Sequence, residues 1–106
     1  MATDDPCCTL VPYFKVHDGQ LDAFKSLCER FVAKTEEEAD VMFYGFSFDG
    51  DVAHCREGYA SAAGVLAHLE NVGALLDEAF KIADLTRLEV MRRSRSWTSS
   101  AGRWPT

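Results

Sequence analysis

The sequence has few of the features that would assign it to a class of protein at once. No run of apolar residues approaches the roughly 20 needed to cross a bilayer as a helix, and no apolar segment of the signal-peptide type follows the N-terminus. The four cysteines, at positions 7, 8, 28 and 55, form no Cys-x-x-Cys pair, so no metal site is expected. These absences predict a cytoplasmic protein with free thiols.

Positive charge is scarce in the first 91 residues, which hold 7 Lys and Arg against 17 Asp and Glu. Such an acidic body repels nucleic acid and anionic membranes, so neither is expected as a partner. Residues 92–106 reverse this balance with four arginines and no acidic residue, and they contain both tryptophans. We interpret residues 1–91 as one domain and residues 92–106 as a basic, poorly ordered tail.

Segments rich in β-branched and aromatic residues occur at four places in the body, and each is expected to form a strand. They cover Cys8–Val16, Val41–Phe48, Val52–Tyr59 and Leu85–Met91. Pro12 lacks an amide hydrogen, which predicts an edge, a bulge or an irregular start for the first strand. Asp49-Gly50-Asp51 is a strong hairpin signal, so the second and third strands are expected to pair antiparallel.

Helical periodicity separates these strands. The expected helices run from Leu21 to about Lys34, from Ser61 as N-cap to about Leu69, and from Leu75 to Ala83. Asp18 is the expected N-cap of the first helix, and Gly73 is expected to break the second. The three consecutive glutamates at positions 36–38 are interpreted as a solvated helix end or loop, and not as part of a site.

The resulting order β-α-β-β-α-β is typical of the ferredoxin-like α+β fold, in which a four-stranded antiparallel sheet carries helices on one face. The second strand is apolar on both faces. The sheet face without helices is therefore too apolar to be left to water, and we expect it to be an interface. The pattern predicts a homodimer that forms through this open sheet face.

The segments HCREGYAS and AAGVLAHLENVG lie on the third strand and the following helix. With the element order, they resemble the antibiotic biosynthesis monooxygenase-like superfamily of dimeric α+β barrels, over about residues 8–91. That group includes cofactor-free anthrone and quinol monooxygenases and small proteins of no known activity. Its better-understood oxygenases pair an Asn with a Trp in the pocket, whereas Trp97 and Trp104 of this chain both lie in the tail.

Oxygenation without a metal or flavin needs a general base in an apolar pocket, and a base works best when its pKa lies near the operating pH. His68 is therefore the candidate catalytic base. Glu57, Tyr59 and Asn71 are the candidate substrate-binding residues, because Asn and Tyr can hold charge on a substrate oxygen. Strand alternation places His54 and Arg56 on the opposite face from Glu57, so they cannot serve the same pocket.

Structural roles remain open for each candidate. His68 could hydrogen-bond a neighbouring strand or the helix end, Asn71 could end its helix before Gly73, and Glu57 could pair with Arg87 or with Arg56 of a neighbouring chain. The leading hypothesis is a small homodimer that binds a small aromatic or quinol-like molecule and oxygenates it without a cofactor. The alternative is a non-catalytic dimeric barrel that acts as a stress-type binding module or a structural protein.

Overall fold

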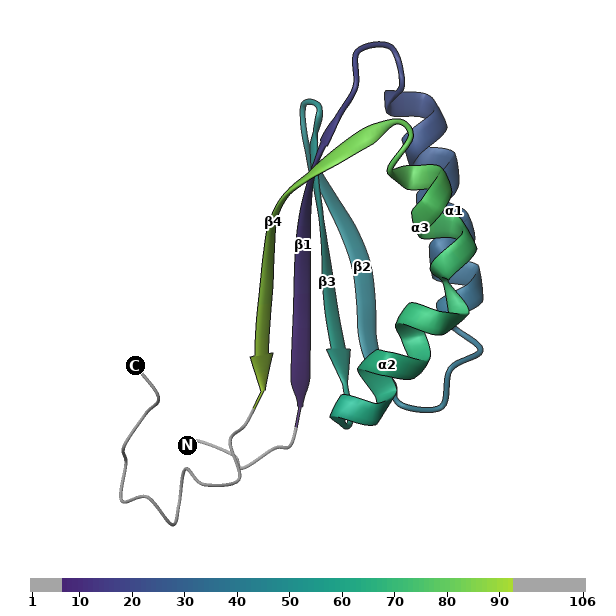
Figure 1. The fold of residues 1–106 in the computed structure, drawn as a ribbon, viewed down its shortest axis with the longest axis vertical. Helices are drawn as coiled ribbons and strands as arrows, with labels where there is room; N and C mark the ends of the chain where they lie inside the picture. The colour runs from purple at the N-terminus through teal and green to yellow at the C-terminus, as the bar shows by residue number, and fades with distance from the viewer. Residues whose placement is uncertain (1–6, 93–106) are drawn as a thin grey trace, which may run out of the picture.

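A computed structural model of the chain describes residues 7–92, which form one four-stranded sheet and three helices (Figure 1). The elements follow in the order β1 (Cys8–Val16), α1 (Leu21–Thr35), β2 (Val41–Asp49), β3 (Val52–Tyr59), α2 (Ala62–Asn71), α3 (Gly73–Ala79) and β4 (Ala83–Arg92). The predicted four strands and their limits are confirmed to within two residues. Most of the predicted tail, residues 93–106, lies outside the described residues.

The sheet has the strand order β2-β3-β1-β4, and every neighbouring pair is antiparallel. The tight turn between β2 and β3 is made by Gly50, whose φ of 60° suits a residue without a Cβ. All three helices lie on one face of the sheet, and the other face carries none (Figure 1). The ferredoxin-like α+β fold is confirmed. No helix of residues 7–92 is long and apolar enough to cross a membrane.

The helix ends follow the predicted signals in one case and not in another. Ser61 caps α2 through its side chain, which accepts a hydrogen bond from the Gly64 amide at 3.2 Å. Asp18 does not cap α1, because the N-cap position falls on Gln20, which makes no side-chain capping bond. The break between α2 and α3 falls on Val72, with Gly73 as the first residue of α3.

Pro12 lies in an inner strand and not at an edge, because β1 has β3 on one side and β4 on the other. The structure has a bulge close to Pro12, but the bulge is not in the first strand. Tyr13 pairs with Arg87 and Phe14 pairs with Leu85, so the extra residue, Thr86, lies in β4.

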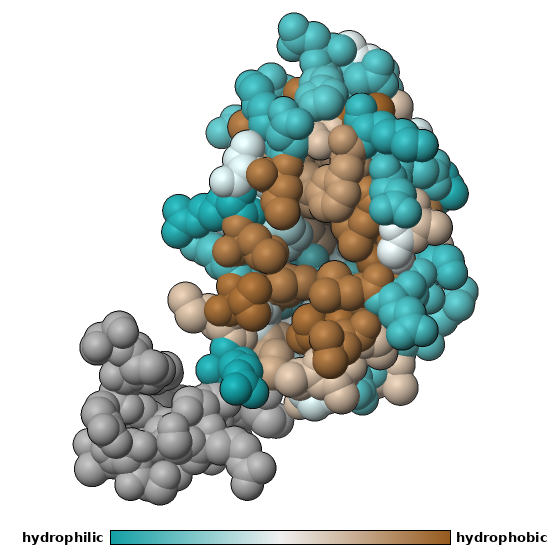
Figure 2. Space-filling view, in the orientation of Figure 1, coloured by the Kyte–Doolittle hydropathy of each residue, from teal (hydrophilic) through white to brown (hydrophobic). Residues whose placement is uncertain are grey.

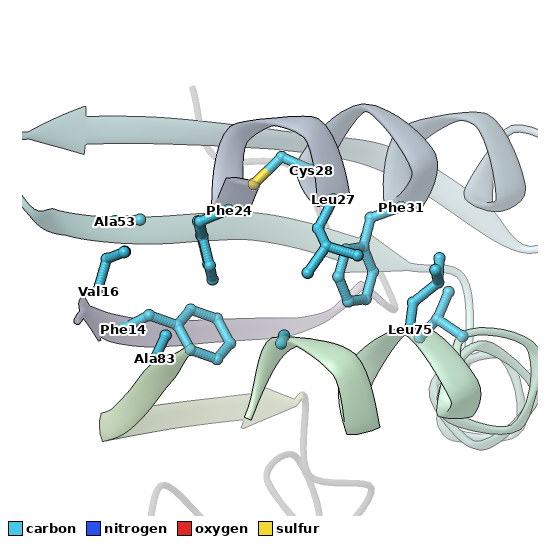
Figure 3. Packing of buried hydrophobic residues seen from close by; sticks show 11 residues of the cluster. Phe14, Val16, Phe24, Leu27, Cys28, Phe31, Ala53, Leu75 and Ala83 are labelled. Atoms are coloured by element: carbon cyan, nitrogen blue, oxygen red, sulfur yellow. The ribbon is translucent and has the colours of Figure 1, made fainter. Parts of the chain in front are cut away.

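The hydrophobic core fills the space between the sheet and helices α1 and α3 (Figure 3). Phe24 and Phe31 of α1 point toward the sheet, and the rings of Phe14 and Phe24 lie 5.4 Å apart. Leu75 of α3 closes the core from the other helix. Because β4 carries only Ala83 into this core, its remaining inward side chains are left to face an open space beside the helices.

Candidate active site

An apolar cavity of about 180 Å³ lies between the inner face of the sheet and the helices. Six aromatic rings line it: Phe14, Phe24, Phe31, Tyr44, Phe46 and Phe80. Leu69 of α2 and Leu88 of β4 stand on opposite sides of its open part. The surface in this orientation shows apolar residues gathered between the helices and β4 (Figure 2). A pocket of this kind, largely apolar with few polar groups, is typical of small-molecule sites.

The polar wall of this cavity is formed by Glu57 of β3 and His68 of α2, which are 3% and 2% exposed. His68 Nε2 lies 3.4 Å from Glu57 Oε1. The Tyr59 hydroxyl donates a hydrogen bond of 2.6 Å to the same carboxyl oxygen. Two of the predicted site residues therefore line the cavity, and Tyr59 holds one of them from behind.

The other side of the imidazole ring meets Glu38, in the segment between α1 and β2. His68 Nδ1 lies 2.9 Å from Glu38 Oε2, and the Glu38 side chain is only 11% exposed. The prediction that residues 36–38 form only a solvated run is therefore wrong for Glu38. The segment turns back beneath α2, where the Ala60 amide donates to the Asp40 carbonyl at 2.8 Å.

Asn71 fixes the position of Glu38 and does not line the cavity. Its side-chain nitrogen donates to Glu38 Oε2 at 2.8 Å and to the Lys34 carbonyl at 3.1 Å. One amide thus connects the end of α1, the Glu38 carboxylate and the end of α2. Asn71 therefore holds Glu38 in place, whereas the prediction placed Asn71 in direct contact with a substrate.

These contacts define which nitrogen of His68 can act as a base. An ionised carboxylate only accepts hydrogen bonds, so the nitrogen that faces Glu38, Nδ1, carries the hydrogen. Nε2 then has its lone pair directed to the cavity side, toward Glu57.

Burial raises the pKa of the Glu57 carboxyl, and the hydrogen bond from Tyr59 and the proximity of His68 only partly oppose this effect. Glu57 is therefore suited to hold a proton at a higher pH than a solvated glutamate. A neutral glutamic acid beside an imidazole can donate a hydrogen bond, which an ionised carboxylate cannot. The pair is an acid and a base placed at one wall of an apolar cavity.

Tyr44 of β2 also lines the cavity and was not among the predicted site residues. Its ring lies 5.2 Å from the His68 ring, and burial raises the pKa of its hydroxyl, which stays neutral. Burial likewise raises the pKa of the Cys55 thiol, which also lines the cavity. Tyr44 lies on the same strand face as Phe46, which indicates burial. Nothing in the local sequence, however, distinguishes a tyrosine that lines a pocket from one in the core.

The remaining polar candidates lie elsewhere. His54 stacks on Tyr13 on the open sheet face, with ring centroids 5.2 Å apart. Arg56 is exposed two residues further along the strand, so the predicted separation of these two residues from Glu57 is confirmed. Arg87 pairs with Glu89 at 2.7 Å and is not the partner of Glu57.

The two glutamates contact opposite nitrogens of His68 and do not converge on one point. Across residues 7–92 no group of three His, Cys, Asp or Glu side chains could hold a metal ion. The described part of the site therefore offers proton donors and acceptors.

No family model and no curated protein matches the chain. Among solved structures, MupZ from Pseudomonas fluorescens shares 40% sequence identity and superposes with a TM-score of 0.83, over 92% of this chain and 81% of MupZ. A candidate antibiotic biosynthesis monooxygenase from Nitrosomonas europaea has a TM-score of 0.77 at 13% identity, over 90% of this chain and 97% of that one. Another, from Chloroflexus aurantiacus, has a TM-score of 0.67 at 15% identity, over 83% and 93%.

The latter two share only the fold with this chain, because their identity is low. The likeness to MupZ extends to the sequence and covers most of both chains. The chain is therefore a sequence relative of MupZ, and it shares its fold with proteins of the antibiotic biosynthesis monooxygenase type.

Proposed function

We propose that this protein binds a small aromatic or quinol-like molecule in the cavity and takes a proton from it with His68. The observation that carries the proposal is the Glu38–His68–Glu57 arrangement, which places a buried acid–base pair at the wall of an otherwise apolar cavity. A structural histidine alone would not require an apolar hollow on its free side. Perturbed titratable groups in a pocket are a mark of functional sites.

The cavity fits the ring of such a molecule. An apolar cavity of about 150 Å³ in another protein accommodates benzene, and this one measures about 180 Å³. Aromatic side chains supply most of its lining, and their faces and edges pack well against a flat ring. A phenol or quinol would place its ring among these side chains and its hydroxyl toward the polar wall.

His68 is the proposed catalytic base. A substrate proton moves to Nε2, and the Glu38 carboxylate stabilises the imidazolium that results through its contact with Nδ1. Protonated Glu57 donates a hydrogen bond to the substrate oxygen, where negative charge develops. Tyr59 and Asn71 are positioning residues in this scheme, since one holds Glu57 and the other holds Glu38.

Oxygenation can follow from this proton transfer without a cofactor. The substrate anion gives one electron to O₂, and the superoxide and substrate radical combine into a peroxide. The ring carbon that bears the peroxide then loses its hydrogen, and the outer oxygen leaves as water, which converts that carbon into a carbonyl. One oxygen atom enters the product and the other leaves as water, and the four electrons that O₂ accepts all come from the substrate.

A homodimer through the open sheet face remains part of the proposal. That face exposes about half of Phe43 and also presents Val11 and Tyr13, which are only partly buried. A second copy would cover these side chains on the sheet face that carries no helices. Light scattering at micromolar concentration should give twice the chain mass, and a monomer would contradict this part of the proposal.

The test is oxygen consumption with a panel of quinols and anthrones. The wild-type protein should consume one O₂ per substrate, and His68→Gln should lower the rate at least 100-fold, as expected for loss of a general base. His17→Gln is the matched control, because His17 lies beyond the end of β1, is exposed and does not line the cavity, and it should keep the full rate. An unchanged rate in His68→Gln would remove this residue from the chemistry.

A different outcome would favour the alternative function. If the same compounds bind to the wild-type protein, as measured by calorimetry, but are not turned over, the protein is a binding module with a filled pocket. If none of them binds, the proposed substrate class is wrong.

A further inference from the structure

The cavity has room for little more than one ring. Its volume of about 180 Å³ lies below the roughly 300–1,000 Å³ that is usual for sites of larger organic ligands. The cavity is not closed, however, because four of the residues that line it are exposed: Leu69, Phe80, Leu85 and Leu88. Any ligand larger than one ring must therefore extend outward between β4 and the helices.

The walls of this opening are apolar over a length greater than the cavity itself. Six exposed side chains form what we call the apolar rim: Leu66, Leu69 and Phe80 from the helices, and Leu85, Leu88 and Val90 from β4. Four of them, residues 69, 80, 85 and 88, also line the cavity. The rim is therefore a continuation of the cavity wall.

The two outermost members extend the rim beyond the cavity. Leu66 precedes Leu69 by three residues on α2, which places both on one side of the helix. Val90 follows Leu88 by two residues on β4, which places both on one face of the strand. Leu66 is 68% exposed and Val90 is 58% exposed. Contiguous exposed apolar surface of this kind marks a place where something apolar binds.

We propose that the substrate carries an apolar extension, such as an alkyl chain, which lies along the apolar rim while its hydroxyl-bearing ring occupies the cavity. This inference rests on the proposed function, because it takes the polar wall as the site of the ring hydroxyl. Two observations favour a ligand over other occupants of the rim. The rim is continuous with the cavity, and the cavity of about 180 Å³ is filled by little more than one ring.

The test is the affinity of a series of 4-alkylphenols, from ethyl to octyl, measured by calorimetry on the full chain. A fully buried methylene tightens binding roughly fourfold. Because the rim leaves one side open to water, we expect about twofold for each methylene. Leu66→Gln and Val90→Gln should each remove much of this gain and leave the affinity for 4-ethylphenol unchanged, since neither residue lines the cavity.

Met42→Gln is the matched control. Met42 is 54% exposed and lies on β2, at the opposite edge of the sheet from β4. It should keep the full chain-length gain, and equal losses in all three variants would mean that the long phenols bind non-specifically. That result would overturn the inference.

The outcomes also separate this inference from the proposed function. Short phenols that bind, together with an affinity that does not change with chain length, would overturn only the apolar extension. The rim would then be covered by another occupant, either residues 93–106 or a second copy of the chain. Failure of every phenol to bind would overturn the proposed function as well.

Discussion

Tyr59→Phe removes one buried hydroxyl beside the proposed acid and leaves the rest of the side chain in place. The Tyr59 side chain is 0% exposed, and its hydroxyl donates a 2.6 Å hydrogen bond to Glu57. Because Phe keeps the ring, the change tests this hydrogen bond and creates no large cavity. A hydrogen bond contributes about 1 kcal/mol to stability with a neutral acceptor and about 1.5–3 kcal/mol with a charged one.

The loss therefore depends on whether Glu57 is ionised. Burial raises the pKa of Glu57 above its ordinary value of 4.5, and the Tyr59 hydrogen bond lowers it. A carboxyl whose pKa is raised in the folded state contributes stability that is complete below its unfolded pKa. This contribution is lost as the pH rises through the folded-state pKa. Without the hydroxyl, that pKa rises further, so the variant loses more stability at high pH than the wild type does.

We expect Tyr59→Phe to lower the free energy of unfolding by about 1 kcal/mol at pH 4 and by about 2–3 kcal/mol at pH 9. Urea unfolding at both pH values and one fixed protein concentration measures this difference. Near neutral pH the melting temperature should fall by roughly 4–8 °C for each kcal/mol.

Tyr13→Phe is the matched control for this experiment. The Tyr13 hydroxyl also donates to a glutamate, Glu89, but at 3.4 Å and in a half-buried position. Its removal should cost less than about 0.5 kcal/mol at either pH. If Tyr59→Phe lost the same amount at pH 4 and pH 9, or no more than Tyr13→Phe, the assigned coupling between the Tyr59 hydroxyl and Glu57 would be refuted.

Two further substitutions test the fold around the site. Gly58→Ala places a Cβ 2.2 Å from the Phe43 ring and should lower the free energy of unfolding by about 1 kcal/mol, since the exposed ring can turn away; Gly45→Ala, with open space around it, is the control, and an equal loss in a Phe43→Ala background would contradict the clash. Ser61→Ala removes the cap of α2 and should lower the free energy of unfolding by about 1 kcal/mol, as measured by thermal unfolding. Ser61→Asp keeps a capping side chain and should lower it little. Equal losses in the two variants would argue against the cap.

Local patterns were sufficient to predict the scaffold of this protein. The apolar stripe of α1, the Asp49-Gly50-Asp51 turn and the Ser61 cap each act through neighbours a few residues away, and the structure has all three. Asp18 failed as a cap because the chain turns through Gly19, which has a φ of 78°, and the helix begins only at Leu21. Competition between such nearby alternatives is hard to resolve without the packed structure.

The candidate site was predictable only in part, because its contacts join distant segments. His68 and Glu57 were singled out as polar residues in apolar surroundings, and both line the cavity. Glu38 was missed because it lies in a run of like charges, and its partner His68 is 30 residues away. No local pattern indicates that this loop returns beneath α2. The same limit explains Asn71, whose role depends on where Glu38 lies.

The bend at Val72 has a consequence for how this site can change in related chains. Backbone hydrogen bonds continue through the bend, from the Val72 amide to His68 and from the Leu76 amide to Val72, so the two helices are joined rigidly. One inserted residue there would rotate α3 by about 100° relative to α2, given 3.6 residues per turn. Leu75 and Ala79 would leave the core while His68 kept its place. A single insertion or deletion at this point therefore changes which side chains of α3 face the cavity and leaves His68 and its two glutamate partners in place.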